Sequence, residues 1–205
     1  MSESKASGLP RFDQMFRESD DPWAFRTRWY EVRKRTLTLA CLPDRRYAHG
    51  YEPGCANGEL SAALATRCDR LLASDVSARA VELARQRLVE FPHARVAQAQ
   101  LPEGWPEGSF DLIVVSELGY FLDAQGVDEI GESARASLRP GGTVLACHWR
   151  RPIQGGSLDG DAVHERLAQR LGLAVLTELR EADFILHVWS DDGRSVAERE
   201  GFDWR

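Results

Sequence analysis

From residue 47 to residue 189 the chain alternates short apolar runs with amphipathic stretches. Four of the apolar runs have the length and composition of strands: RLLASD (70–75), ARVAQAQ (94–100), FDLIVVSE (110–117) and TVLACHW (143–149). The last two are almost continuously apolar, which is typical of parallel strands that are covered on both faces. The pattern therefore predicts a sheet with buried, parallel central strands.

Between these runs, apolar residues recur at helical spacing. They form three sets: Leu60, Ala63, Leu64 and Cys68; Ala80, Leu83, Ala84 and Leu88 behind a Ser77 cap; and Val163, Leu167 and Leu171. RPGG (139–142) predicts a helix stop and a turn. LAVLTELREADFILHVWS (173–190) predicts two tightly joined strands, an antiparallel pair at the sheet edge. Alternating strands and helices predict a doubly wound α/β domain.

Length and charge narrow the class of protein. With 205 residues, 43% of them apolar, the chain can bury one sizeable core, so we expect a helical N-terminal segment (1–43) and one domain (44–205). A net charge of −6 disfavours binding to nucleic acid or to an acidic membrane, and favours a small-molecule partner. The four cysteines have no metal-binding spacing, and neither a signal peptide nor a membrane span is apparent. We expect a cytoplasmic protein without a metal site.

The stretch GYEPGCANGEL (50–60) follows the weakly apolar first strand candidate, YAHGYE, and holds three glycines. In a doubly wound sheet, the first strand-to-helix turn forms one wall of the ligand crevice. Gly54 and Gly58 would allow the backbone to bend sharply and approach a ligand, although glycines after a strand can also simply make a turn. The loop therefore indicates a cofactor site.

The spacing of this loop indicates which cofactor. A dinucleotide site needs G-x-G-x-x-G, whereas this chain has E-x-G-x-A-x-G, which argues against an NAD-dependent enzyme. The acid at Glu52 suits a cationic or ammonium-bearing ligand, and Asp75, at the end of the second strand, can accept both hydroxyls of a ribose. An adenosine joined to an amino acid carries these groups.

These residues resemble those of class I S-adenosylmethionine-dependent methyltransferases, and more specifically of the nodulation-factor N-methyltransferase (NodS) family. The resemblance covers residues 10 to 190 and rests on DPWAFRTRWYEVRKRTLTLACLP, GCANG, WPEGSFDLIVVSELGYFL, LRPGG and HWRRP followed by DGDAVH. It implies a Rossmann-like sheet of seven strands with the last strand antiparallel, and an N-terminal helical lid. It also implies that S-adenosylmethionine is converted to S-adenosylhomocysteine while the amine of a deacetylated glucosamine unit in an oligosaccharide is methylated.

The resemblance and the residue chemistry together give a set of candidate site residues. The cofactor set is Trp23, Arg28, Glu52, Gly54, Cys55, Ala56, Gly58, Asp75, Val76, Gln100, Leu101 and Ser116. The catalytic candidates are Glu117, Tyr120 and His148, with Arg150 expected at the mouth of the crevice. Gln100 takes the adenine-binding role because an amide oxygen can accept from the adenine amino group, with Leu101 packing on the ring. His148 can act as a base near neutral pH, or can be a buried structural histidine.

Two departures from the family pattern leave alternatives open. Ala56 replaces the central glycine of the loop, and Gln98 and Gln100 stand where an acid is usual after the third strand. These changes favour a weakly active or inactive S-adenosylmethionine-binding protein, whereas the other site residues favour an active enzyme. The sequence separates a methyltransferase that acts on an amine from one that acts on a hydroxyl only poorly.

Overall fold

The computed structural model describes residues 9–202 and places a seven-stranded sheet at their centre, in the order β3-β2-β1-β4-β5-β7-β6. The strands are β1 (Gly50–Pro53), β2 (Leu71–Asp75), β3 (Ala94–Gln98), β4 (Phe110–Ser116), β5 (Leu138–Trp149), β6 (Ala174–Arg180) and β7 (Phe184–Ser190). Strands β1 to β5 pair in parallel, and β7 is antiparallel to both of its neighbours. The expected doubly wound fold with a reversed last strand is confirmed.

Side-chain alternation along the central strands divides the core between the two faces of the sheet. Leu112 and Val114 of β4 pack on one face with α2 (Trp29–Ala40) and α3 (Glu59–Ala65). Ile113 and Val115 pack on the other face with α5 (Ala124–Ser137) and α6 (Gly160–Leu171). Helix α4 (Ala78–Arg87) packs on β2 and β3 and is capped by Ser77, as the sequence predicted. Both faces are covered, which explains the apolar central strands.

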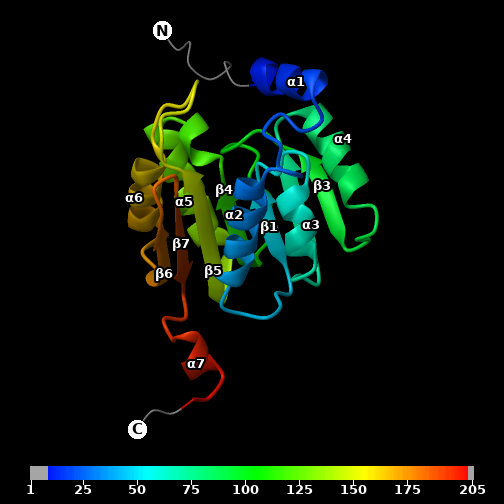
Figure 1. The fold of residues 1–205 in the computed structure, drawn as a ribbon. Coiled ribbons are helices and arrows are strands. Elements are labelled where there is room, and N and C mark those ends of the chain that lie inside the picture. Colours follow the sequence, from blue (N-terminus) through cyan, green and yellow to red (C-terminus); the bar gives the residue numbers. More distant parts are fainter. Residues whose placement is uncertain (1–8, 203–205) are drawn as a thin grey trace.

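Of the two N-terminal helices, α1 (Leu9–Glu18) lies at the end of the sheet where the parallel strands finish, and α2 packs on one face (Figure 1). Helix α1 packs on α4 at the upper end of the molecule, and α2 lies in front of β1 (Figure 1). Between the helices, the Asp21 carboxylate accepts hydrogen bonds from the backbone N–H groups of Phe25 and Arg26. Asn57 of the glycine loop donates to Asp21, which ties the connecting segment to the body of the domain.

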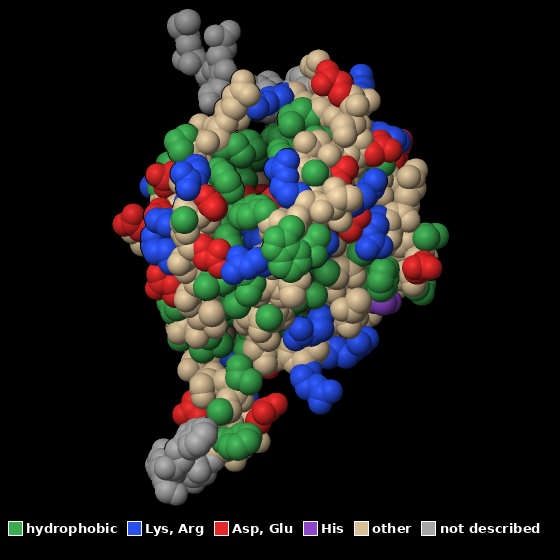
Figure 2. Space-filling model, in the orientation of Figure 1, with side chains coloured by type: hydrophobic (Ala, Val, Ile, Leu, Met, Phe, Trp, Pro, Cys, Tyr) green, Lys and Arg blue, Asp and Glu red, His purple; other side chains and the backbone are tan. Residues whose placement is uncertain are grey.

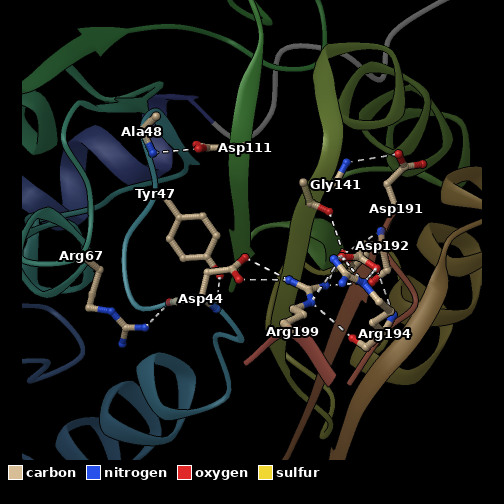
Figure 3. A network of polar contacts seen from close by, with 12 residues as sticks. Asp44, Tyr47, Ala48, Arg67, Asp111, Gly141, Asp191, Asp192, Arg194 and Arg199 are labelled. Carbon is tan, nitrogen blue, oxygen red and sulfur yellow. Dashed lines mark hydrogen bonds and ion pairs between the residues drawn. The ribbon is translucent and has the colours of Figure 1, made fainter. Parts of the chain in front are cut away.

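The opposite end of the sheet carries a separate polar network (Figure 3). Helix α7 (Val196–Arg199) is anchored there because Arg199 donates to both carboxylate oxygens of Asp44, at 3.0 and 3.1 Å. Nearby, the Asp111 carboxylate accepts from the backbone N–H groups of Ala48 and His49, each at 2.7 Å. These contacts fix the chain ahead of β1 and lie far from the end that α1 covers.

Two local expectations are corrected by the structure. The first strand begins at Gly50, and Tyr47 makes only an isolated bridge with Cys68. The segment RPGG, expected as a turn outside the strand, belongs to β5, which starts at Leu138. Gly141, with φ of 75°, absorbs the irregularity there, and the pairing with β4 shifts register at this point. A bulge therefore takes the place of the expected turn.

Among residues 9–202, no helix combines the length and apolar character needed to cross a membrane. The same residues contain no group of three or more His, Cys, Asp or Glu side chains that could hold a metal ion.

Candidate functional site

A cavity of about 1180 Å³ opens where the carboxyl ends of β1, β2 and β4 meet the N-terminal helices. Figure 2 shows hydrophobic side chains around a hollow at this upper end. Ligand pockets usually have volumes of about 300–1,000 Å³, so this cavity can hold a cofactor together with an acceptor. The expected residues on its wall are Trp23, Arg28, Gly54, Ala56, Asp75, Val76, Gln100, Leu101, Glu117 and Tyr120.

The glycine loop follows β1 and is held by the carboxylate at the end of β2. Asp75 accepts hydrogen bonds from the backbone N–H groups of Ala56 and Ser77, each at 2.9 Å. Burial raises the pKa of Asp75 above its ordinary value, although these N–H donors oppose the shift. Gly54 adopts a φ of 73°, and a Cβ there would contact Leu118 at 3.4 Å. The loop is thus bent toward the cavity with its backbone exposed to a ligand.

Four other cofactor candidates lie behind the loop rather than on the main cavity. Glu52, Cys55 and Ser116 line a separate small cavity of about 60 Å³. Burial raises the pKa of Glu52 to about 8, and its Oε2 atom has no hydrogen-bond partner. Gly58 lines neither cavity: a Cβ at this position would stand 2.9 Å from Cα of Ala84. This glycine therefore allows α3 and α4 to approach closely, and its φ of 83° provides the sharp bend that the sequence predicted. Its approach to a ligand stays a prediction.

The far wall of the cavity is formed by the segment after β3. Gln100 and Leu101 line it together with Val76, in agreement with the placement expected for an adenine site. Gln98 instead points back, because its amide donates to the carbonyl of Val76 at 3.0 Å. Of the two glutamines, only Gln100 contributes to the main cavity wall.

Glu117 occupies a strained position directly after β4. Its φ is 54°, a left-handed conformation that is uncommon for residues other than glycine and is often found at functional sites. One carboxylate oxygen accepts from Lys34 of α2, and the other accepts from the Tyr120 hydroxyl and, at 3.1 Å, from the backbone N–H of Trp149. Lys34 also lies 3.0 Å from Glu31. A partly buried ion pair thus connects α2 to the floor of the cavity.

The charges in this cluster determine its protonation states. Burial by itself would raise the pKa of Glu117, but the Lys34 ammonium and the Tyr120 hydroxyl outweigh burial and leave the pKa below its ordinary value. Burial and the Glu117 charge both raise the pKa of Tyr120, which therefore remains a hydrogen-bond donor. Burial opposes the charge of Lys34, yet the two carboxylates raise its pKa. Glu117 is consequently ionised at neutral pH beside a permanent cation.

Aromatic side chains from the N-terminal segment form the roof of the cavity. Phe16 meets Trp23 edge to face at 5.5 Å between ring centroids, and Trp23 lies 5.4 Å from Phe25. Phe12 of α1 makes a similar edge contact with Phe121 at 4.9 Å. All five rings line the cavity, so its upper side is more apolar than the sequence indicated.

Two residues expected near the acceptor do not reach the cavity. The side chain of His148 is fully buried, and burial lowers its pKa to about 4. Its Nε2 atom accepts from the backbone N–H of Gly119, so it has no contact with the cavity through which it could act as a base. Arg150 is held by two hydrogen bonds to Asp161, both at 2.8 Å. These contacts direct Arg150 away from the crevice mouth.

The sequence reasoning missed Lys34, Glu31 and Trp149. Lys34 is 7% exposed although it belongs to a helix rich in arginine. The signal was present: a lysine three residues after a glutamate and four after a tyrosine lies on the face that α2 turns toward the sheet. Only the fold reveals its partner, because Glu117 lies 83 residues away in the chain.

Ala56 has a φ of 50°, so its left-handed conformation can be tested directly. In this conformation alanine costs about 1 kcal/mol relative to glycine. Glycine, however, loses more chain entropy on folding, and this loss offsets most of the stability that the substitution would gain. We expect Ala56→Gly to change the free energy of unfolding by less than about 1 kcal/mol. Ala56→Val should lower it by about 2 kcal/mol or more, since a β-branched residue tolerates this region poorly. Urea denaturation measures both. Equal stability of the two variants would contradict the observed conformation.

Comparison with protein families gives one matching model, nodulation protein S (NodS), over residues 12–169. Among curated proteins, the chain is 31% identical over 126 residues to nodulation protein S of Sinorhizobium fredii, covering 60% of this chain and 58% of that protein. Nodulation protein S of Rhizobium tropici is 28% identical over 170 residues, covering 78% and 66% of the two chains. The chain therefore spans about half to two thirds of the length of the curated relatives it matches.

Two solved structures are similar over most of the chain. A candidate methyltransferase from Pseudomonas syringae is 56% identical, with a TM-score of 0.72, covering 80% of this chain and 99% of that chain. The N-methyltransferase NodS of Bradyrhizobium japonicum WM9, in complex with S-adenosylhomocysteine, is 25% identical with a TM-score of 0.73. That match covers 88% of this chain and 98% of the other.

Proposed function

Because the chain belongs to the nodulation protein S (NodS) family of class I S-adenosylmethionine-dependent methyltransferases, we propose that it methylates the nitrogen of a small-molecule amine. The observation that carries this proposal is Glu117 on the cavity wall, whose carboxylate is ionised and whose backbone is held in a strained conformation. A carboxylate offers about four acceptor positions, and three donors are identified here: Lys34, Tyr120 and the N–H of Trp149. One position remains for the N–H of an acceptor amine.

The residues around the glycine loop fit S-adenosylmethionine. The Asp75 carboxylate lines the cavity and accepts from backbone N–H groups of the loop and of the residues after β2, and its remaining acceptor capacity is available to a ribose hydroxyl. Gly54 permits close approach of the backbone, Gln100 and Leu101 would hold the adenine, and Arg28 would pair with the carboxylate of the amino-acid part. When bound, the cofactor supplies a methyl group that is already activated on a sulfonium.

Alignment is the main contribution of the protein to such a transfer. We propose that Glu117 accepts a hydrogen bond from the amine and so directs its lone pair, while Tyr120 and Lys34 fix the carboxylate. The described part of the 1–43 segment, with its aromatic roof, would exclude water and act as a lid over the site. His148, buried behind the turn, is not given a proton-transfer role here.

For the acceptor, we propose an amino sugar or a related amine on a larger body. Two features support this: the cavity carries several carboxylates, which attract a cationic ligand, and its acceptor end offers Asp123, Gln125 and Ser157 beside the aromatic rings. The net charge of −6 favours a small molecule over a nucleic acid. An O-methyltransferase is the alternative that the acceptor screen below must exclude.

Calorimetric titration with S-adenosylhomocysteine, followed by a methyl-transfer screen over amines and hydroxyls, tests the proposal. We expect binding of S-adenosylhomocysteine but not of NAD, and transfer to amino sugars or other amines. Transfer to phenols or catechols alone would overturn the amine assignment. Absence of S-adenosylhomocysteine binding would overturn the cofactor assignment as well.

The rate of transfer should rise with pH. An amine with a solution pKa above neutrality must lose its proton before it attacks, so kcat/KM is expected to increase about tenfold per pH unit below the pKa of the amine. The lowered pKa of Glu117 places its own titration below this range. Initial rates measured between pH 6 and 9 with one amine acceptor check the slope. A rate that is flat over this range would show that the proton is not lost before the rate-limiting step.

A further inference from the structure

Three histidines form a continuous chain of contacts between the site and the sheet edge. His148 of β5 accepts at Nε2 from the backbone N–H of Gly119, at 3.0 Å. Its Nδ1 lies 3.0 Å from Nε2 of His164 on α6, and Nδ1 of His164 lies 2.7 Å from Nδ1 of His187 on β7. Nε2 of His187 lies 3.8 Å from the carboxylate of Glu178 on β6. Three elements, β5, α6 and β7, thus each contribute one imidazole to the chain, and β6 contributes the carboxylate at its outer end.

The position of every proton in the neutral chain follows from its inner end. A backbone N–H is always a donor, so Nε2 of His148 carries no proton and Nδ1 must carry it. That proton is donated to Nε2 of His164, whose own proton therefore lies on Nδ1. The Nδ1 proton of His164 is donated in turn to Nδ1 of His187. The proton of His187 therefore lies on Nε2 and is directed at Glu178. Each imidazole has a single permitted tautomer.

The inner end of the chain fixes the turn that carries the proposed catalytic groups. Gly119 begins a short 3₁₀ helix that includes Tyr120, and it lies two residues after Glu117. A Cβ on Gly119 would stand 2.4 Å from Val163, so the turn is packed tightly against α6. The ring of His148 also meets that of Tyr120 edge to face, at 5.5 Å. The histidine chain therefore holds the turn by a hydrogen bond and by packing.

Solvent reaches the chain only at its outer end. His148 and His164 are 0% and 2% exposed, whereas the side chain of His187 is 14% exposed. The charged groups around His187 are Glu178 and Arg180 from β6 and Asp161 from α6. Glu117 and Lys34 act on His148, and Arg180 acts on His164. Burial lowers the pKa of each of the three histidines, so all are neutral at pH 7. Because His187 alone of the three is exposed beyond a few per cent, a proton from solvent enters the chain there.

We propose that His148, His164 and His187 are positioning residues that hold the Glu117 turn through Gly119, and that protonation of His187 releases this hold. A cationic His187 has protons on both nitrogens, so Nδ1–H would face Nδ1–H of His164. Moving the proton of His164 to Nε2 only shifts the conflict to His148. A further shift makes Nε2–H of His148 face the N–H of Gly119. One contact must break wherever the extra proton is accommodated.

The tautomers can be tested without any methyl-transfer assay. In protein labelled with ¹⁵N at histidine, we expect the Nδ1–H form for His148 and His164 and the Nε2–H form for His187 at pH 8. Acidification through the titration of His187 should then shift the amide resonance of Gly119. An Nε2–H tautomer at His148 or His164, or a Gly119 resonance that does not respond, would overturn the proposal.

The effect on turnover rests on the proposed methyltransferase activity and is tested separately. His187→Gln keeps an acceptor for His164 and a donor for Glu178 but cannot be protonated. Below the pKa of His187, both the amine and His187 lower the rate, so the slope of the logarithm of the rate against pH should approach two for the unaltered protein. It should remain near one for the variant, in which only the amine titrates. The unaltered protein should thus lose about tenfold more activity one unit below that pKa, each protein being compared with its own rate at pH 8.

His93→Gln is the matched control, because His93 contacts the carbonyl of Ala65 and lies outside the histidine chain. Its pH profile should follow that of the unaltered protein. Identical profiles for all three proteins would overturn the link between the histidine chain and turnover. If no acceptor is methylated by any of the proteins, the proposed function fails while the magnetic resonance experiment still decides the histidine chain.

Discussion

Lys34→Met is expected to lower the free energy of unfolding by about 3 kcal/mol at pH 7 and to remove most methyl transfer. The substitution takes the cation away from a partly buried carboxylate that otherwise accepts only from Tyr120 and the N–H of Trp149 among the described contacts. Removing one partner of a buried ion pair leaves the other charge uncompensated, which costs more than the pair itself contributes. Chemical denaturation and initial rates measure the two losses.

The pH dependence of this variant should have the opposite sign to that of the unaltered protein. In the unaltered protein the folded pKa of Glu117 lies below 4.5, so its contribution to stability is present above that value and is lost as pH falls through the folded pKa. Without Lys34, burial raises the folded pKa of Glu117 above 4.5. Its ionised form then destabilises the variant at neutral pH. Acidification from pH 7 toward that raised pKa should therefore recover stability.

The double variant Lys34→Met/Glu117→Gln separates charge from packing. Removing the carboxylate charge of Glu117 should restore part of the lost stability, because a neutral amide can still accept from Tyr120. The remainder should stay lost, since Glu31 is still without its cation. Methyl transfer should remain low, since the ionised acceptor is gone. A single variant with unchanged stability and pH dependence would mean that groups other than Lys34 keep Glu117 ionised.

Much of the fold was predictable because each strand carries a local signal. The runs that form β2, β4 and β7 are apolar over most of their length, and the helices between strands show one apolar face. The start of β5 was predicted wrongly, since the composition of RPGG indicates a turn whether the chain stops there or forms a bulge. The residues of a turn can be recognised from a few neighbouring positions in the sequence. Whether such residues form a bulge instead depends on the strand with which they pair.

The site was predictable where function depends on sequence spacing, and less so where it depends on contacts distant in the chain. The glycine loop and the carboxylate after β2 lie on the same cavity wall because parallel strands end at one edge of the sheet. The Lys34–Glu117 pair and the burial of His148 depend on how α2 and α6 pack, which no local pattern specifies. The bend at Gly58 was predicted from its place in the loop, and its φ of 83° agrees; its packing against Ala84 was not, because Ala84 belongs to another helix.

Asp75→Ala is expected to weaken binding of S-adenosylhomocysteine by about 1.5–3 kcal/mol, which is about tenfold to a hundredfold or more in Kd. Asp75 serves the backbone as well as the ligand, because it accepts from the N–H groups of Ala56 and Ser77. The variant should therefore also lose stability. A change in affinity by itself would not separate direct contact with the ligand from disorder of the glycine loop.

Asp111 provides a matched control for the loss of stability that accompanies removal of a carboxylate held by backbone N–H groups. Like Asp75, it accepts from two backbone N–H groups, here those of Ala48 and His49, at 2.7 Å each. Asp111 lies at the opposite end of the sheet (Figure 3) and does not line the cavity. Asp111→Ala should lose a comparable amount of stability and keep its affinity for S-adenosylhomocysteine. Calorimetric titration of both variants separates an effect at the ligand site from a general loss of stability. If Asp75→Ala binds the ligand as tightly as Asp111→Ala does, Asp75 holds the loop and has no direct contact with the cofactor.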